Sequence, residues 1–229
     1  MLNVINLTKK YGKTYAVNDI SFYVNDGEIA VLLGPNGAGK STSIKCITGL
    51  LKYEGQIDIC GYTNKSLEAK RLFGYVPETP AMYEMLTVYE HLEFIAGAYK
   101  IEDYKEKAEV LLERFELSDK RDKLGKELSK GMQQKVQFIG ALLHEPQLII
   151  MDEPFSGLDP SNAIVLKDVL LELKKAGKTL LLSTHRMDQA ERMCDSICLI
   201  NHGRALLEGD LRQMKSSIRH AQRADQVRR

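Results

Sequence analysis

A glycine-rich run that follows a short apolar segment contains the residues best suited to chemistry in this sequence. Residues Gly34–Thr42 read GPNGAGKST and match the phosphate-binding pattern GxxxxGK[ST] at every fixed position. Glycines let the backbone turn so that its N–H groups converge on phosphate oxygens, and the following helix points the positive end of its dipole at the same anion. Within the run, we expect Lys40 to reach the outer phosphates of a nucleotide and the Ser41 hydroxyl to hold Mg²⁺.

Two adjacent carboxylates follow a second apolar run. Leu148–Met151 reads LIIM and is followed directly by Asp152 and Glu153. An aspartate at this place suits the magnesium shell of a phosphate-loop enzyme, and the glutamate beside it can polarise an attacking water as a general base. An Asp-Glu pair at a strand end is common, so this pair gains its meaning from the phosphate loop that precedes it in the same predicted sheet.

A third candidate combines a hydroxyl with the start of a helix. Ser129 and Gly131 stand where a new helical pattern begins, which offers an anion both a serine hydroxyl and free backbone N–H groups. An ordinary helix cap has the same appearance, and these residues alone favour the ordinary cap.

Composition and charge exclude several classes of protein. The chain has 229 residues, 44% of them hydrophobic and 28% charged, which is ordinary for a globular protein. Its net charge is +1, so the chain lacks the excess of basic residues that is typical of nucleic-acid-binding proteins. The longest apolar runs are of strand length, whereas a membrane span needs about 20 apolar residues. Since Met1–Lys10 also lacks the apolar core of a signal peptide, we expect a chain that neither crosses a membrane nor is secreted.

The candidate residues need a scaffold, and the sequence predicts an α/β one. Short apolar runs that read as strands alternate with helical patterns, which is typical of a mainly parallel sheet flanked by helices. The predicted strands are Ile29–Leu33, Leu148–Met151, Thr179–Ser183 and Ile197–Ile200.

One stretch, from about residue 80 to residue 143, is helical in pattern and contains no clear strand. Thr87 and Glu90 form a capping box that opens a helix. Residues 105–115 and 132–143 have the apolar spacing of two further helices.

These patterns divide the chain into parts. We interpret residues 1–79 and 144–210 as one α/β catalytic core and residues 80–143 as a helical subdomain inserted into it. Residues 211–229 form a tail with six basic residues and one acidic residue. A solvated helix is the simplest interpretation of this tail, and contact with an anionic membrane surface or a partner is the alternative.

In this order, the residues resemble the nucleotide-binding domain of an ABC transporter. The resemblance extends from Tyr11 to about Asp210, nearly the whole chain. It implies a single ATPase domain, with a P-loop NTPase core of the RecA-like type and a small antiparallel β region near the N-terminus. The motifs that carry it are Gly34–Thr42 (Walker A), Gly74–Glu78 (Q-loop), Leu128–Gln133 (ABC signature), Leu148–Glu153 (Walker B), Ser156–Asp159 (D-loop) and His185 (switch histidine).

The resemblance implies which residues hydrolyse ATP. Glu153 and His185 would be catalytic, with the histidine in contact with the γ-phosphate. Ser41, Glu78 and Asp152 would surround Mg²⁺.

It also implies how ATP is held. Tyr11 would stack on the adenine, with Val17 nearby on the same nucleotide wall. Ser129 and Gly131 would contact the γ-phosphate of an ATP bound to a second subunit, and Asp159 would belong to the D-loop at that interface. The expected phosphate-binding residues are Asn36, Gly37, Ala38, Gly39, Lys40, Ser41 and Thr42.

Two departures from the family pattern stand out. Glu78 occupies the Q-loop position where most of the family has glutamine, and a glutamate offers only acceptors and a negative charge. Lys130 and Met132 replace the common glycine and glutamine of the signature, but Ser129 and Gly131 remain. We expect magnesium binding and activity to survive, with coupling to the partner altered.

The function that the resemblance implies is Mg²⁺-dependent ATP hydrolysis that powers transport through a separate membrane permease subunit. The Q-loop, signature and switch segments look most like those of bacterial exporters, with importers as the alternative. The cassette would pair head to tail with a second nucleotide-binding domain, as a homodimer or a heterodimer. It would lie in the cytoplasm, peripheral on the inner face of the cell membrane, and no nucleic-acid partner is expected.

Two other functions compete with transport. One is the ATPase cassette of a machine that acts on nucleic acid or the ribosome. The other is a non-hydrolysing regulatory subunit, which the intact Glu153 and His185 disfavour.

Overall fold

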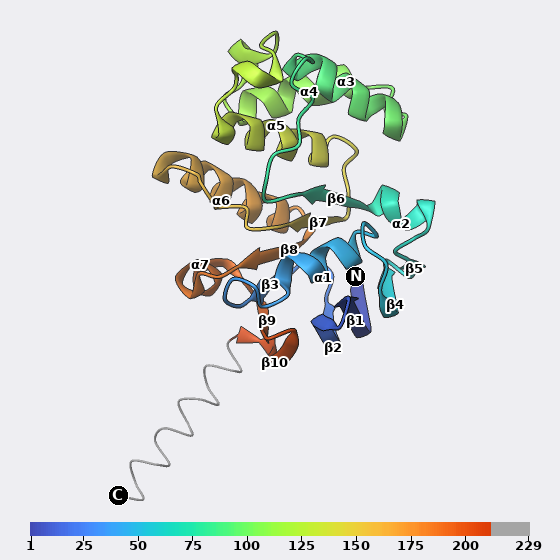
Figure 1. Cartoon of the computed structure of the whole chain (residues 1–229). Coiled ribbons are helices and arrows are strands. Elements are labelled where there is room, and N and C mark those ends of the chain that lie inside the picture. The colour runs from blue at the N-terminus through green and yellow to red at the C-terminus, as the bar shows by residue number, and fades with distance from the viewer. Residues whose placement is uncertain (212–229) are drawn as a thin grey trace, which may run out of the picture.

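The fold is described by a computed structural model, which covers residues 1–211 apart from the side chains of Gln189 and Arg192. Two sheets and seven α-helices make up this part of the chain (Figure 1). The strands are β1 (Leu2–Tyr11), β2 (Thr14–Val24), β3 (Ile29–Leu33), β4 (Glu54–Ile59), β5 (Tyr62–Thr63), β6 (Phe73–Val76), β7 (Leu148–Met151), β8 (Thr179–Thr184), β9 (Ser196–Asn201) and β10 (Arg204–Asp210). The helices are α1 (Lys40–Ile47), α2 (Leu67–Leu72), α3 (Val88–Tyr99), α4 (Tyr104–Arg114), α5 (Lys130–Leu142), α6 (Pro160–Lys175) and α7 (Met187–Met193).

The six-stranded sheet has the order β10-β9-β3-β8-β7-β6. Five of its strands, β9, β3, β8, β7 and β6, run parallel to one another. Its central strands are apolar throughout because both faces of the sheet are covered. In β3, Ile29, Val31 and Leu33 face one hydrophobic cluster, whereas Ala30 and Leu32 face the other. The predicted mainly parallel sheet is confirmed.

Helices and a second sheet cover the two faces. The face of Val31 is covered by α5, α6 and α7, and α3 and α4 pack on α5. The other face packs against α1 and an antiparallel sheet of order β2-β1-β4-β5. The small antiparallel region expected near the N-terminus is therefore confirmed, and Figure 1 shows it at the opposite end of the molecule from α3, α4 and α5.

Strands β6 and β7 are neighbours in the sheet, and the chain between them forms α3, α4 and α5. The same segment contains two short 3₁₀ turns, Ser118–Lys120 and Gly125–Glu127. The predicted capping box is present, since the Thr87 hydroxyl accepts from the Glu90 N–H at 3.1 Å and the Glu90 carboxylate accepts from the Thr87 N–H at 2.8 Å. This element order agrees with a helical insertion. That residues 80–143 form a subdomain of their own stays a prediction.

A glycine in β6 allows the last turn of α5 to lie directly on the sheet. A Cβ at Gly74 would stand 2.2 Å from the Ala141 carbonyl oxygen and 3.2 Å from Pro146 Cγ. Only a residue without a side chain fits between these backbones.

The hydrophobicity of the helices and the position of the C-terminal tail complete the description of the fold. In residues 1–211 none of the helices combines the length and hydrophobicity required to span a bilayer. The predicted basic tail lies outside the described residues except for Leu211, which is buried.

We expect Gly74→Ala to lower the free energy of unfolding by about 1–3 kcal/mol, because the added methyl group overpacks the contact with α5. The matched control is Gly97→Ala in α3, where a Cβ meets no atom within 4 Å and alanine should add up to about 1 kcal/mol to helix stability. Urea denaturation followed by circular dichroism measures both. Equal stability of the two variants would contradict the close approach.

Candidate active site

The phosphate loop joins β3 to α1 and is shaped by two tight contacts. A Cβ at Gly34 would lie 2.1 Å from the Ile200 carbonyl oxygen, and one at Gly39 would lie 2.5 Å from the Ala16 carbonyl oxygen. Gly39 also has φ +109°, a conformation that side chains disfavour. The two glycines therefore hold the loop against β9 on one side and β2 on the other.

The N-terminus of α1 is open to an anion. Its cap residue is Gly39, which offers no side chain to the first backbone N–H groups. Asn36 and Gly37 are exposed at the tip of the loop, Ala38 is buried, and Ser41 and Thr42 are partly buried in the first turn of the helix. Helix dipole and free N–H groups together make this a site for phosphate.

The Lys40 ammonium group lies beneath the loop. It donates to the carbonyl oxygens of Gly34 at 2.8 Å and Pro35 at 3.2 Å, and it forms an ion pair with Glu153 at 3.3 Å. The Lys40 side chain is only 5% exposed and that of Glu153 10%. A buried cation is thus held between the loop that binds phosphate and the carboxylate predicted to act on water.

Glu153 is positioned by an unusual backbone and by a histidine. Its φ is +46°, in the left-handed region that costs a non-glycine residue about 1–3 kcal/mol. His185 Nδ1 lies 3.1 Å from both oxygens of its carboxylate. Since a carboxylate only accepts, Nδ1 carries the hydrogen of this contact. The two residues predicted to be catalytic are therefore in contact with each other, and Glu153 also contacts Lys40.

Ser41 and Asp152 lie together at the same edge of the sheet. The Ser41 hydroxyl donates to Asp152 Oδ1 at 3.0 Å, and Asp152 is 2% exposed. Hydroxyl and carboxylate oxygens are hard ligands of the kind Mg²⁺ prefers, and Mg²⁺ in phosphate sites is commonly held by one or two protein oxygens together with substrate phosphates. The residues present fit the ion.

Glu78 follows β6 at an exposed position. Burial raises the pKa of the nearby Tyr75 phenol to about 12, with smaller contributions from the negative charges of Asp152 and Glu78. A role of Glu78 in holding Mg²⁺ stays a prediction.

Tyr11 and Val17 differ in their surroundings. Tyr11 is 52% exposed at the end of β1, with the Lys9 ammonium group 5.3 Å from its ring centre. Val17 is fully buried in β2, and its Cγ2 lies 3.6 Å from the position of a Cβ at Gly39. The Tyr11 ring is thus half exposed beside a cation, whereas Val17 packs beneath the phosphate loop at Gly39. Contact of either with adenine stays a prediction.

The signature residues are held apart from the phosphate loop. Ser129 caps α5, its hydroxyl accepting from the Met132 N–H at 3.3 Å, and Gly131 lies near Leu158 and Asn162. Because α5 and α1 pack on opposite faces of the sheet, the two motifs are separated. In the described part of the chain, no hydrogen bond or ion pair joins Ser129 to residues 34–42.

Asp159 caps α6 close to the signature. Its carboxylate accepts from the Asn162 N–H at 3.0 Å and from the Asn162 side-chain amide at 2.5 Å. These hydrogen bonds lower the pKa of the Asp159 carboxyl.

Sequence reasoning missed two buried polar residues. Ser183, fully buried at the end of β8, contacts both Asp152 and Glu153. Gln134 in α5 donates to the Pro154 carbonyl oxygen at 2.9 Å and so links the signature helix to the loop after Glu153. The available signal was a polar residue inside a buried apolar pattern, which normally has a hydrogen-bonding partner.

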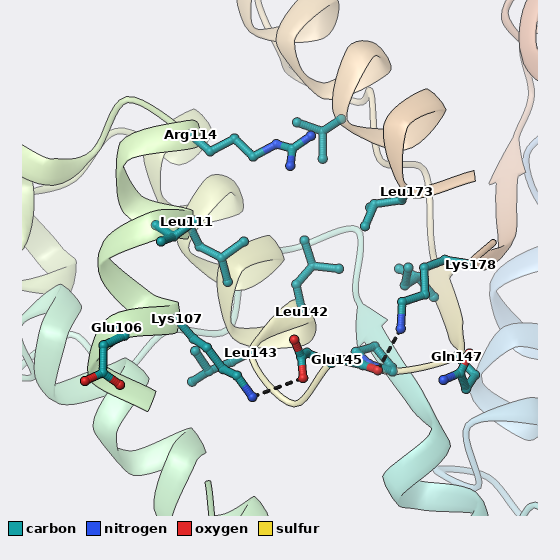
Figure 2. Close-up of a pocket in the computed structure, with 14 residues that line it drawn as sticks. Glu106, Lys107, Leu111, Arg114, Leu142, Leu143, Glu145, Gln147, Leu173 and Lys178 are labelled. Atoms are coloured by element: carbon teal, nitrogen blue, oxygen red, sulfur yellow. Dashed lines mark hydrogen bonds and ion pairs between the residues drawn. The ribbon is translucent and has the colours of Figure 1, made fainter. Parts of the chain in front are cut away.

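A separate groove of about 670 Å³ lies between α4, the end of α5 and α6 (Figure 2). Lys107 and Glu145 form an ion pair across it at 3.0 Å, and Lys178 donates to the Glu145 carbonyl oxygen at 2.9 Å. It includes Gln147 and Lys178, which precede β7 and β8, so it opens at the opposite edge of the parallel sheet from the phosphate loop.

A family model and two related protein sequences point to the same family. Residues 17–156 match the family model described as ABC transporter. The chain is 40% identical over 95% of its length to the ABC transporter ATP-binding protein YhaQ of Bacillus subtilis, covering 74% of that protein. It is 38% identical over 89% of its length to the Nod factor export ATP-binding protein I of Burkholderia orbicola, covering 69% of it.

Solved structures show the same fold. An ATP-binding subunit of an ABC transporter superposes with a TM-score of 0.89 and 40% identity, over 95% of this chain and 93% of that one. A dimeric ATP-binding cassette in a post-hydrolysis state, bound to ADP and Pi, superposes with a TM-score of 0.83 and 28% identity, over 92% of this chain and 99% of that one.

If the open helix end and Lys40 hold phosphates, inorganic triphosphate with Mg²⁺ should raise the melting temperature by about 5–10 °C at a hundredfold excess over its Kd. Lys40→Ala should abolish most of this rise, because it removes the buried cation. Lys45→Ala, at an exposed position in the same helix, is the control. Differential scanning calorimetry measures the shift, and an undiminished rise in Lys40→Ala would refute the assignment.

Proposed function

The chain belongs to the ATP-binding subunits of ABC transporters, which hydrolyse ATP to drive transport, and from that premise we propose that it does so at the site formed by Lys40, Glu153 and His185. The convergence of these three side chains beside an open helix N-terminus is the observation that carries the proposal. The expected chemistry is Mg²⁺-dependent hydrolysis of ATP to ADP and phosphate.

The residues divide the work of phosphoryl transfer, which depends on positioning and charge neutralisation. The N–H groups of residues 36–42 and the Lys40 ammonium group bind the phosphates. Ser41, Asp152 and Glu78 would hold Mg²⁺, which when bound neutralises charge on the transferred phosphoryl group. Entry of the phosphates competes with Glu153 for Lys40, which frees the carboxylate to orient water while His185 contacts the γ-phosphate.

Each site would be completed by a second cassette. Ser129 and Gly131 lie at the start of α5, which packs on the opposite face of the sheet from α1, and in the described residues no hydrogen bond joins Ser129 to the phosphate loop of its own chain. A head-to-tail dimer brings the signature of one chain to the ATP of the other, and loss of the γ-phosphate removes this link. Dimeric cassettes among the similar structures support the arrangement.

A membrane permease would dock beside Glu78. Tyr83, Met85 and Phe94 are 55%, 69% and 55% exposed, and the rings of Tyr83 and Phe94 lie 5.3 Å apart. Tyr83 and Met85 lie in the loop between the Q-loop and α3, and Phe94 lies on α3, the first helix of the inserted segment. Exposed aromatic and methionine side chains of this kind are typical of interface cores. The cassette would then sit on the cytoplasmic face of the membrane.

Export is the direction we favour. The Q-loop, signature and switch segments resemble those of bacterial exporters, and the similar protein of Burkholderia orbicola is named for Nod factor export. Transport assays in inverted membrane vesicles test the direction, since ATP added outside then drives an exported compound into the lumen.

We expect Glu153→Gln to bind ATP and to form a stable dimer while hydrolysis falls at least about 100-fold, as for loss of a general base. Sedimentation velocity with Mg²⁺ and ATP measures the dimer, and phosphate release measures hydrolysis. Glu113→Gln, on the exposed side of α4, is the control. An ATP-loaded Glu153→Gln chain that stays monomeric at high concentration would count against a shared site.

Tagged Glu153→Gln, purified from membranes with ATP, should bring down a multi-span membrane protein in stoichiometric amount, identified by mass spectrometry. Adding Phe94→Arg should weaken this association about tenfold or more, since a buried aromatic anchor commonly contributes over 1 kcal/mol. Leu67→Arg, at an apolar position on α2 that is also exposed, at 71%, should leave it unchanged. Recovery of ribosomal or DNA-bound proteins in place of a membrane protein would overturn the transport role.

A further inference from the structure

Ser183 makes two hydrogen bonds with the acidic pair at the end of β7. Its hydroxyl donates to Asp152 Oδ1 at 2.5 Å and accepts from the Glu153 backbone N–H at 2.9 Å. The side chain is fully buried. A serine hydroxyl has one hydrogen and two lone pairs, so one group serves both neighbours at once.

These bonds act where the charges are crowded. Asp152 and Glu153 are adjacent acidic residues that are both buried, and water can do little to stabilise their carboxylates. A hydroxyl that donates to one carboxylate is polarised by it, which strengthens its acceptance of the next N–H. The bond to the Glu153 N–H also supports the left-handed backbone at that residue, where φ is +46°.

The end of β8 thereby fixes three parts of the site. Ser183 holds the acidic pair through its side chain. The Thr184 carbonyl oxygen accepts from the Gly34 N–H at 3.2 Å, at the start of the phosphate loop. His185 contacts the Glu153 carboxylate. Because these residues are consecutive, a shift of one moves the others.

We propose that Ser183 is a positioning residue for ATP hydrolysis, which fixes the Asp152 carboxylate and the Glu153 backbone in one arrangement. The proposal rests on the proposed function, since a positioning role presupposes hydrolysis at Glu153. It assigns Ser183 to the rate of the chemical step and not to the binding of ATP.

The test compares two buried hydroxyls on the same strand. Thr179, at the opposite end of β8, accepts from the Gly27 N–H at 2.8 Å and is also fully buried. Ser183→Ala and Thr179→Val each delete a hydroxyl that accepts one backbone N–H. Loss of stability alone would affect both variants alike.

We expect Ser183→Ala to lower kcat about 10- to 100-fold, the range for groups that orient metal ligands, with KM for ATP changed less than about threefold. Thr179→Val should keep kcat within about twofold. Hydrogen exchange without nucleotide should show the Glu153 amide exchanging at least about tenfold faster in Ser183→Ala, and the Gly27 amide likewise in Thr179→Val. Ser183→Cys, which keeps a weak donor, should fall between serine and alanine and serves if Ser183→Ala does not fold.

Equal kcat in wild type and Ser183→Ala would overturn the proposal, as would an unchanged Glu153 amide. If kcat fell as much in Thr179→Val as in Ser183→Ala, the role of Ser183 would be structural only. Absence of ATPase activity in the wild-type chain would instead contradict the proposed function, and the exchange of the Glu153 amide would still decide whether Ser183 holds that backbone.

Discussion

The buried ion pair between Lys40 and Glu153 is the interaction around which the site is arranged. An ammonium group and a carboxylate removed from water need partners for every charge, and the surrounding structure provides them. Two loop carbonyl oxygens accept from Lys40, and His185 contacts Glu153. The phosphate loop, the acidic pair and the histidine therefore form one network, although they come from three separate parts of the chain.

Parallel strands make that network possible. β3, β7 and β8 are adjacent and parallel, so the loops that follow them emerge at one edge. Tight backbone contacts fix how these loops lie, most clearly at Gly34 against Ile200 and at Gly39 against Ala16. The helical segment between β6 and β7 places the signature on the other face of the sheet, and this separation is the structural reason why a single chain supplies half of each proposed site.

The sequence was most informative where local chemistry decides the outcome. Strands such as Ile29–Leu33 and Leu148–Met151 were predicted with their observed bounds because both faces of the sheet bury apolar residues. The capping box at Thr87 and the phosphate loop follow from local patterns as well. The role of Ser183 and the burial of Val17 depend on which strands become neighbours, and no local pattern specifies that. The pairing of Lys40 with Glu153 joins residues 113 positions apart in the chain, so it too emerges only from the tertiary fold.

The close approach of Gly74 to Ala141 has a mechanical consequence. Because of this contact, the C-terminal turn of α5 packs directly on β6, the strand that leads to Glu78. Ser129 lies at the other end of the same helix. At 1.5 Å per residue, Ser129 lies about 18 Å from Ala141 along the helix axis. If α5 tilted by about 10° about its contact at Ala141, Ser129 would move by about 3 Å, roughly the length of one hydrogen bond. A small rotation of α5 about its contact with β6, the strand that leads to Glu78, would therefore displace Ser129 far enough to make or break a hydrogen bond.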